Sequence, residues 1–149
     1  MKFFIDGDAF VNLLKPIVFK AIEKYQLETY VISNKKINIG ESKNIHYLIV
    51  DEGLDKADDL IVTMVQENDL VVTADIPLAD RVVSKGALAL DHRGTLFDEN
   101  NIKGHLATRN LMQEIRESGE TTRGPAPFSK KDTHNFATQL NNVLYKRFQ

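Results

Sequence analysis

The chain has 149 residues, 42% of them apolar, which is enough for one domain with a complete hydrophobic core. Its formal net charge is −2, so no overall positive charge draws it toward nucleic acid, and such binding would depend on local basic groups. The chain contains no cysteine. This excludes disulfides and thiolate zinc sites and leaves carboxylate and imidazole groups as the available metal ligands.

Hydropathy argues against a membrane-spanning or secreted protein, and histidine spacing argues against a zinc protein. No apolar stretch approaches the length of a membrane span, and the N-terminus lacks the basic segment, apolar stretch and cleavage site of a signal peptide. We therefore expect a cytoplasmic protein that does not bind membranes. The four histidines do not have the spacing of zinc ligands, so no zinc site is expected.

Five short apolar runs, most of them rich in β-branched or aromatic residues, predict five strands. They cover residues 2–5, 29–33, 46–50, 70–73 and 87–90. Between them lie segments with helical spacing, in which apolar residues recur at intervals of three and four. The alternation predicts a single α/β domain over residues 1–149, with a parallel five-stranded sheet and helices on both faces.

The pattern changes after the fifth predicted strand. Residues 98–119 and 129–148 each have the spacing and end signals of a helix, so two C-terminal helices are expected. The segment GETTRGPAPF between them contains proline and glycine and predicts a surface loop.

Acidic residues follow most of the predicted strands at their carboxyl ends, where an open parallel sheet places its functional crevice. Those after the first, third, fourth and fifth strands are Asp6, Asp8, Asp51, Glu52, Asp75 and Asp91. Carboxylates that converge without compensating positive charge repel one another, which raises some of their pKa values or favours a bound cation. Mg²⁺ and Mn²⁺ suit such oxygen-only sites.

Two adjacent acids, Asp58 and Asp59, lie near the start of a predicted helix. At 100° per residue, Asp58 falls beside the apolar stripe of this helix and Asp59 points away from it. We therefore expect Asp58 to face the crevice. Each acid taken alone has a structural interpretation as well, as a helix cap, a turn residue or a solvated helix start.

Segments spread over nearly the whole chain carry a family resemblance. They are DGDAF after the first strand, LDKADDLIV, DLVVTADIPLADRVVSKGALAL, HRG at 92–94, LATRNLMQEIRESG and GPAPFS. In this order they resemble the YaiI/YqxD family of bacterial proteins. The resemblance implies a PIN-like fold, a parallel sheet with an acidic pocket related to that of metal-dependent ribonucleases.

The resemblance also implies roles for individual residues. The family's acidic positions correspond to Asp6, Asp8, Asp58 and Asp75. Arg93 matches the arginine of a family turn, and Arg109 matches that of the helix motif LATRNLM. Three residues depart from the family pattern: Phe10 and Val11 replace cysteine and proline, and His92 replaces proline.

Such a pocket would support metal-dependent hydrolysis of a phosphodiester, with RNA as the expected substrate. Asp6 and Asp75 would be the main ligands of Mg²⁺ or Mn²⁺, and Asp8 and Asp58 would bind a second ion or hold waters. The candidate contacts to the polyanion are Arg93, Arg109, Arg123, Lys130 and Lys131. Of these, Arg93 directly follows the fifth strand and is expected at the edge of the crevice.

Three alternatives use the same sheet. In a haloacid-dehalogenase phosphotransferase, Asp6 would be the nucleophile, and a lysine and a later acidic pair would complete the pocket. The residues considered for these roles are Lys85 and Asp91, and neither has an obviously suitable sequence context. In a signalling receiver, Asp51 would accept the phosphoryl group, with Thr73 after the fourth strand and a lysine at the end of the fifth, where this chain has Asp91, His92 and Arg93. In the third alternative, the protein is a non-catalytic module that binds RNA or another protein.

Overall fold

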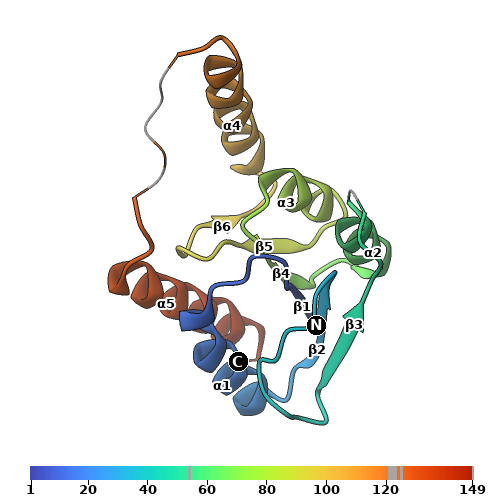
Figure 1. Cartoon of the computed structure of the whole chain (residues 1–149). Coiled ribbons are helices and arrows are strands. Elements are labelled where there is room, and N and C mark those ends of the chain that lie inside the picture. Colours follow the sequence, from blue (N-terminus) through green and yellow to red (C-terminus); the bar gives the residue numbers. More distant parts are fainter. Residues whose placement is uncertain (54, 121–123, 125, 149) are drawn as a thin grey trace.

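The computed structural model describes residues 1–53, 55–120, 124 and 126–148, and within them six strands form one mixed sheet (Figure 1). The strands are β1 (Lys2–Asp6), β2 (Glu28–Ser33), β3 (Ile45–Ile49), β4 (Leu70–Val72), β5 (Leu88–Leu90) and β6 (Leu96–Phe97). Their order across the sheet is β3-β2-β1-β4-β5-β6. All neighbouring pairs among the first five strands are parallel, and β6 runs antiparallel to β5.

The five predicted strands are confirmed, but the prediction of a five-stranded, wholly parallel sheet is wrong by one strand. β6 has only two residues, too few for a period-two pattern to appear in the sequence. It returns alongside β5 through a tight turn in which Asp91 Oδ1 accepts hydrogen bonds from the backbone N–H groups of Arg93 and Thr95. Gly94 completes this turn at a φ of 92°, which favours glycine.

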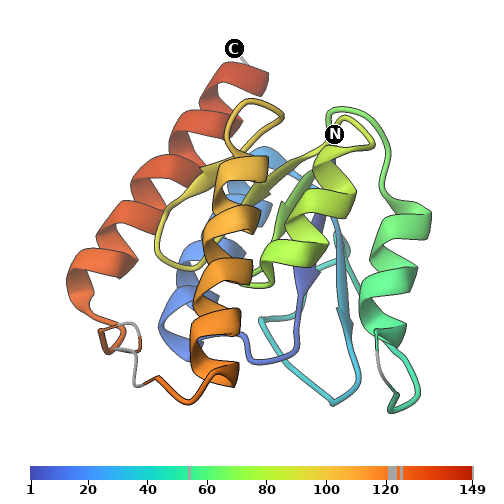
Figure 2. The same cartoon turned by 90° about the horizontal axis from the view of Figure 1, so that it is seen from above.

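Helices cover both faces of the sheet, as predicted (Figures 1 and 2). They are η1 (Asn12–Leu14), α1 (Lys15–Tyr25), α2 (Lys56–Met64), α3 (Ile76–Val83), α4 (Ile102–Glu117) and α5 (Lys130–Arg147). Phe3 and Ile5 of β1 pack into a core with α1 and α5, while Phe4 packs into a second core with α2 and α3. Burial on both faces explains why the central strands read as continuous apolar runs.

The two C-terminal helices are present, with one shifted boundary. α4 begins at Ile102 rather than near residue 98, because the Asp98 carboxylate accepts the backbone N–H groups of Asn100 and Asn101 in a preceding turn. α5 begins directly after Ser129, whose side chain and Asp132 form a reciprocal capping box. In the part of the chain that the structure describes, no helix has the length and apolar character needed to cross a bilayer.

The connections place a switch point at the centre of the sheet. From β1 the chain builds outward through β2 to β3, and it then returns to place β4 and β5 on the other side of β1. The two outward paths therefore diverge between β1 and β4. In open α/β sheets, the crevice at such a point, beyond the carboxyl ends of the strands, is the usual ligand site.

Candidate functional site

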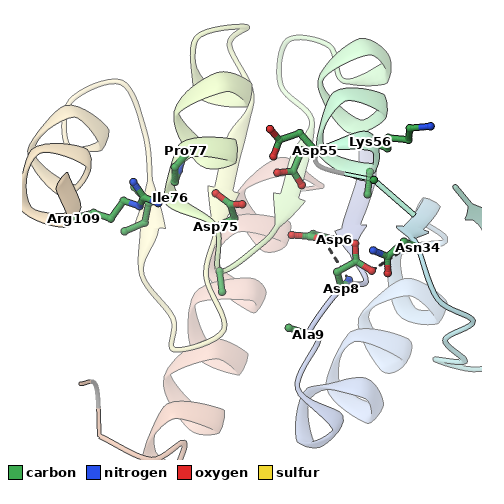
Figure 3. Close-up of a pocket in the computed structure, with 14 residues that line it drawn as sticks. Asp6, Asp8, Ala9, Asn34, Asp55, Lys56, Asp75, Ile76, Pro77 and Arg109 are labelled. Carbon is green, nitrogen blue, oxygen red and sulfur yellow. Dashed lines mark hydrogen bonds between the residues drawn. The ribbon is translucent and has the colours of Figure 1, made fainter. Parts of the chain in front are cut away.

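A pocket of about 550 Å³ opens at this switch point (Figure 3). Its lining includes all four aspartates predicted from the sequence, which are Asp6, Asp8, Asp58 and Asp75. β1 and the turn after it supply the first two, the first turn of α2 supplies the third, and the N-terminus of α3 supplies the fourth. Acids from three separate segments thus meet in one cavity.

Asp6 ends β1 and is the most buried of the four, with 7% of its surface exposed. Its Oδ2 accepts a hydrogen bond of 2.8 Å from Thr73 Oγ1, and its Oδ1 accepts a longer one of 3.3 Å from the Asp8 backbone N–H. Burial raises the pKa of Asp6 to about 6, although these hydrogen bonds act in the opposite direction. The charges of Asp8 and Asp75 contribute further to the increase in pKa.

The turn after β1 depends on a glycine. A Cβ at Gly7 would lie 2.8 Å from the Ser33 Cβ, so only glycine lets the chain pass this close to the end of β2. The turn then brings Asp8 over the next loop, where its Oδ1 accepts a 2.9 Å hydrogen bond from the Asn34 backbone N–H (Figure 3). The spacing D-G-D therefore serves to place two carboxylates at one edge of the pocket.

The tripeptide Thr73–Ala74–Asp75 joins β4 to α3 and connects two of the acids. Thr73 is fully buried, and its Oγ1 donates to Asp6 while accepting the Asp75 backbone N–H at 3.0 Å. Asp75 is the N-cap of α3, because its Oδ1 accepts the Leu78 backbone N–H at 3.1 Å. Asp75 thus has a structural role as well as a place in the pocket.

The prediction that Asp58, rather than Asp59, faces the crevice is confirmed. Asp58 lines the pocket, whereas Asp59 forms a 2.9 Å ion pair with Arg81 on the neighbouring helix. Burial raises the pKa of Asp58 to about 7, with further increases from the charges of Asp75 and Asp6 and from a hydrogen bond with Asp75. Asp55 adds a smaller increase.

The donor chemistry of the pocket fits a hard divalent cation, which prefers carboxylate oxygens. None of the four aspartates forms an ion pair with a described basic side chain. However, among the described residues no group of three or more histidine, aspartate or glutamate side chains is already arranged to hold a metal ion. A cation would therefore have to draw the carboxylates closer together than they lie here.

The predicted arginines lie in different places. Arg109, on α4, lines the pocket opposite the end of β1 (Figure 3). Arg93 is not among the lining residues: its guanidinium donates to Asp132 Oδ2 at 3.0 Å and to the Ala126 carbonyl at 2.6 Å, which holds the segment before α5. Lys130 and Lys131 are exposed in the first turn of α5, and Arg123 lies outside the described residues.

A comparison with known proteins assigns the chain to a family. A family model described as "Uncharacterized BCR, YaiI/YqxD family" matches residues 4–146. The chain belongs to this family. The resemblance seen in the sequence motifs is thereby confirmed, and the four predicted pocket aspartates lie within the matched range.

Several relatives in this YaiI/YqxD group match over almost their full length. A UPF0178 protein of Sulfurimonas denitrificans is 62% identical over 146 residues, which cover 98% of this chain and 97% of the relative. A UPF0178 protein of Sulfurovum sp. is 61% identical, with 98% and 99% covered, and one of Nitratiruptor sp. is 54% identical, with 98% and 96% covered. No solved structure matches the chain.

Three polar residues of the pocket were not singled out from the sequence. Asn34 lies in the loop after β2, and Asp55 and Lys56 lie at the start of α2. Asn34 could have been found by examining the polar residues that follow the second predicted strand, as was done for the acidic residues after the other strands. Lys56 brings an ammonium group to the rim, but Figure 3 shows it pointing away from Asp6 and Asp8.

The geometry does not favour the two phosphoryl-transfer alternatives. Asp51, the acceptor required of a receiver, follows the edge strand β3 and lines a different, shallow hollow with Asp59. Lys85, the lysine considered for a dehalogenase-like site, donates a hydrogen bond to the Val62 carbonyl beyond the C-terminal end of α3. Asp91 is used in the β5–β6 turn.

Proposed function

We propose that this protein is a metal-dependent nuclease with a PIN-like pocket, which hydrolyses phosphodiester bonds in single-stranded RNA. The single observation that supports the proposal is the convergence of Asp6, Asp8, Asp58 and Asp75 at the switch point of the sheet without an ion-pair partner among the described residues. Carboxylates in this arrangement repel one another, and a bound cation would remove that repulsion.

The residues of the pocket would have different roles in metal binding. Asp6 and Asp75 would hold Mg²⁺ or Mn²⁺, and Asp8 and Asp58 would bind a second ion or orient waters. When bound, the cation would supply an activated water and offset the negative charge of the phosphate. Thr73 fixes the orientation of the Asp6 carboxylate, and the Asn34 backbone N–H does the same for Asp8.

Arg109 is the basic residue best placed to contact the substrate. It lies on the opposite wall of the pocket from Asp8, so a phosphate between them would face a guanidinium on one side and the acidic group on the other (Figure 3). Because Arg93 is held by Asp132 and Ala126, we assign it to the anchoring of α5 instead.

Cleavage of end-labelled single-stranded RNA by the purified protein tests the proposal. We expect cleavage in Mn²⁺ and none in chelator, and a loss of more than about 100-fold for Asp6→Asn and for Asp58→Asn. Asp59→Asn is the matched control, because Asp59 neighbours Asp58 on the same helix but points away from the pocket. This variant should retain activity within about twofold of the wild type.

Two results would contradict the proposed nuclease activity. Equal activity of Asp6→Asn and the wild type would identify the cleavage as that of a contaminant. RNA binding of equal affinity in Mn²⁺ and in chelator, without products in either, would instead support the non-catalytic binding module.

A further inference from the structure

The outer side of α4 carries apolar and small residues where a peripheral helix normally carries polar ones. α4 packs against α3 at the edge of the molecule (Figures 1 and 2). Ile102 is buried and Arg109 lines the pocket, and at 100° per residue both lie on the inner side of the helix. Leu111 lies about 180° from Ile102 and is 56% exposed.

Four residues form a stripe on this outer side, of which Ile115 is half-buried and the other three are exposed. Gly104, Thr108, Leu111 and Ile115 recur at intervals of four, three and four, which is the spacing of a helix–helix contact. A Cβ at Gly104 would meet nothing within 4 Å, so no contact inside the described protein requires a glycine there. Glycine inside a helix is nevertheless unfavourable compared with alanine. A close neighbour outside the chain would explain both the glycine and the exposed leucine.

The stripe is complementary to itself when two copies run antiparallel. If the pair is centred between residues 109 and 110, Gly104 of one copy lies opposite Ile115 of the other, and Thr108 lies opposite Leu111. Each large side chain then meets a small one, which allows the helices to approach closely. A two-fold axis produces this contact twice, as in most homodimers.

The charges beside the stripe are also complementary in this arrangement. Lys103 and Glu114 lie on one flank of α4, the lysine in its first turn and the glutamate in its last turns. In an antiparallel pair, equivalent flanks face each other, so Lys103 of one copy comes beside Glu114 of the other. Lys103 is 71% exposed and now pairs with Asp80 at 2.7 Å, an exposed contact that binds it weakly.

We propose that α4 is a self-association surface, through which two copies of this chain pair antiparallel along Gly104, Thr108, Leu111 and Ile115. The contact involves one helix from each copy and is smaller than a standard interface, so the dimer is expected to be weak. Because Arg109 lies on the opposite side of α4, both acidic pockets remain open. The proposed self-association is therefore independent of the proposed nuclease activity.

Sedimentation of the full chain over about 10–500 µM tests the surface, since a small interface predicts a concentration-dependent monomer–dimer equilibrium in this range. Leu111→Glu should abolish the dimer and leave the circular dichroism spectrum unchanged. Leu13→Glu is the matched control, because Leu13 is 60% exposed but lies in η1. A monomeric wild type at the highest concentration, or a dimer that survives Leu111→Glu, would overturn the proposal.

Charge reversal tests the antiparallel orientation. Lys103→Glu and Glu114→Lys should each weaken the homodimer by roughly tenfold, because each places like charges on facing flanks. Mixing the two variants should restore association as a heterodimer, since each flank then meets its opposite. If the mixture associates no better than either variant alone, the antiparallel pairing is wrong.

Discussion

At Asp6, burial and charge act on a single carboxylate. The residue ends a buried strand, and it carries a carboxylate into a cavity where other acids already lie. Thr73 provides one hydrogen bond, but this does not restore an ordinary pKa. Such an arrangement costs stability whenever the group is ionised, and it is typical of functional sites.

The raised pKa of Asp6 should make the free energy of unfolding of the metal-free protein depend on pH. In the unfolded chain Asp6 titrates near 3.8, and in the folded protein it titrates at about 6, so the folded state binds the proton more tightly. The contribution of protonated Asp6 to the free energy of unfolding is therefore fully present below about pH 4, and it is lost as the pH rises through 6. Asp6→Asn should remove this loss, which is at most about 2–3 kcal/mol.

Urea unfolding between pH 4 and pH 7, in chelator, measures the difference between wild type and Asp6→Asn. Subtracting the two curves removes the contributions of the acids that do not interact with Asp6. Asp58 adds to the difference in the same direction, because the Asp6 charge raises its pKa in the wild type. The variant should gain in stability relative to the wild type as the pH rises from 4 to 7. A relative loss over the same range would mean that the ionised carboxylate is stabilised in the fold, and would contradict the account of this residue.

At the scale of elements, α3 shows how one residue can serve both fold and site. Asp75 caps the helix through Leu78, and the same side chain faces Asp6 and Asp58 in the pocket. The cap needs only an oxygen acceptor, whereas a metal site needs the negative charge. Asparagine preserves the first property and removes the second, and alanine removes both.

Substitution of Asp75 should separate these two roles. We expect Asp75→Ala to be less stable than Asp75→Asn by about 0.5–2 kcal/mol in chelator, because only alanine removes the cap. Both variants should lose any stabilisation by Mn²⁺. Thermal and urea unfolding measure both effects. Equal stability of the two variants would show that the cap contributes little, and retained Mn²⁺ stabilisation in Asp75→Asn would exclude Asp75 as a ligand.

At the scale of the whole molecule, the strand order explains why the acids meet. β1 and β4 are far apart in sequence but adjacent in the sheet. Their carboxyl ends lie on either side of the switch point. The turn after β1 and the loop after β4 therefore open toward each other. α2 closes the remaining side and adds Asp58.

The sequence predicted most of this, and its failures have physical reasons. Short apolar runs located the first five strands, helical spacing located the segments between them, and the helical angle separated Asp58 from Asp59. β6 was missed because two residues carry no periodicity, and the start of α4 because the Asp98 turn resembles a cap. Arg93 was predicted at the crevice from its position after β5, but side chains from α5 decide where it points, and sequence order does not reveal them.

The proposed function depends on binding of a divalent cation in the acidic pocket, and thermal unfolding with and without Mn²⁺ measures this binding. A cation at about ten times its dissociation constant adds roughly 1.4 kcal/mol to the folded state. For a chain of this size, that corresponds to a rise of a few degrees in melting temperature. We predict this rise for the wild type and for Asp59→Asn in millimolar Mn²⁺ relative to chelator, and no rise for Asp6→Asn. An unchanged melting temperature of the wild type, or an equal rise in Asp6→Asn, would contradict cation binding in the pocket.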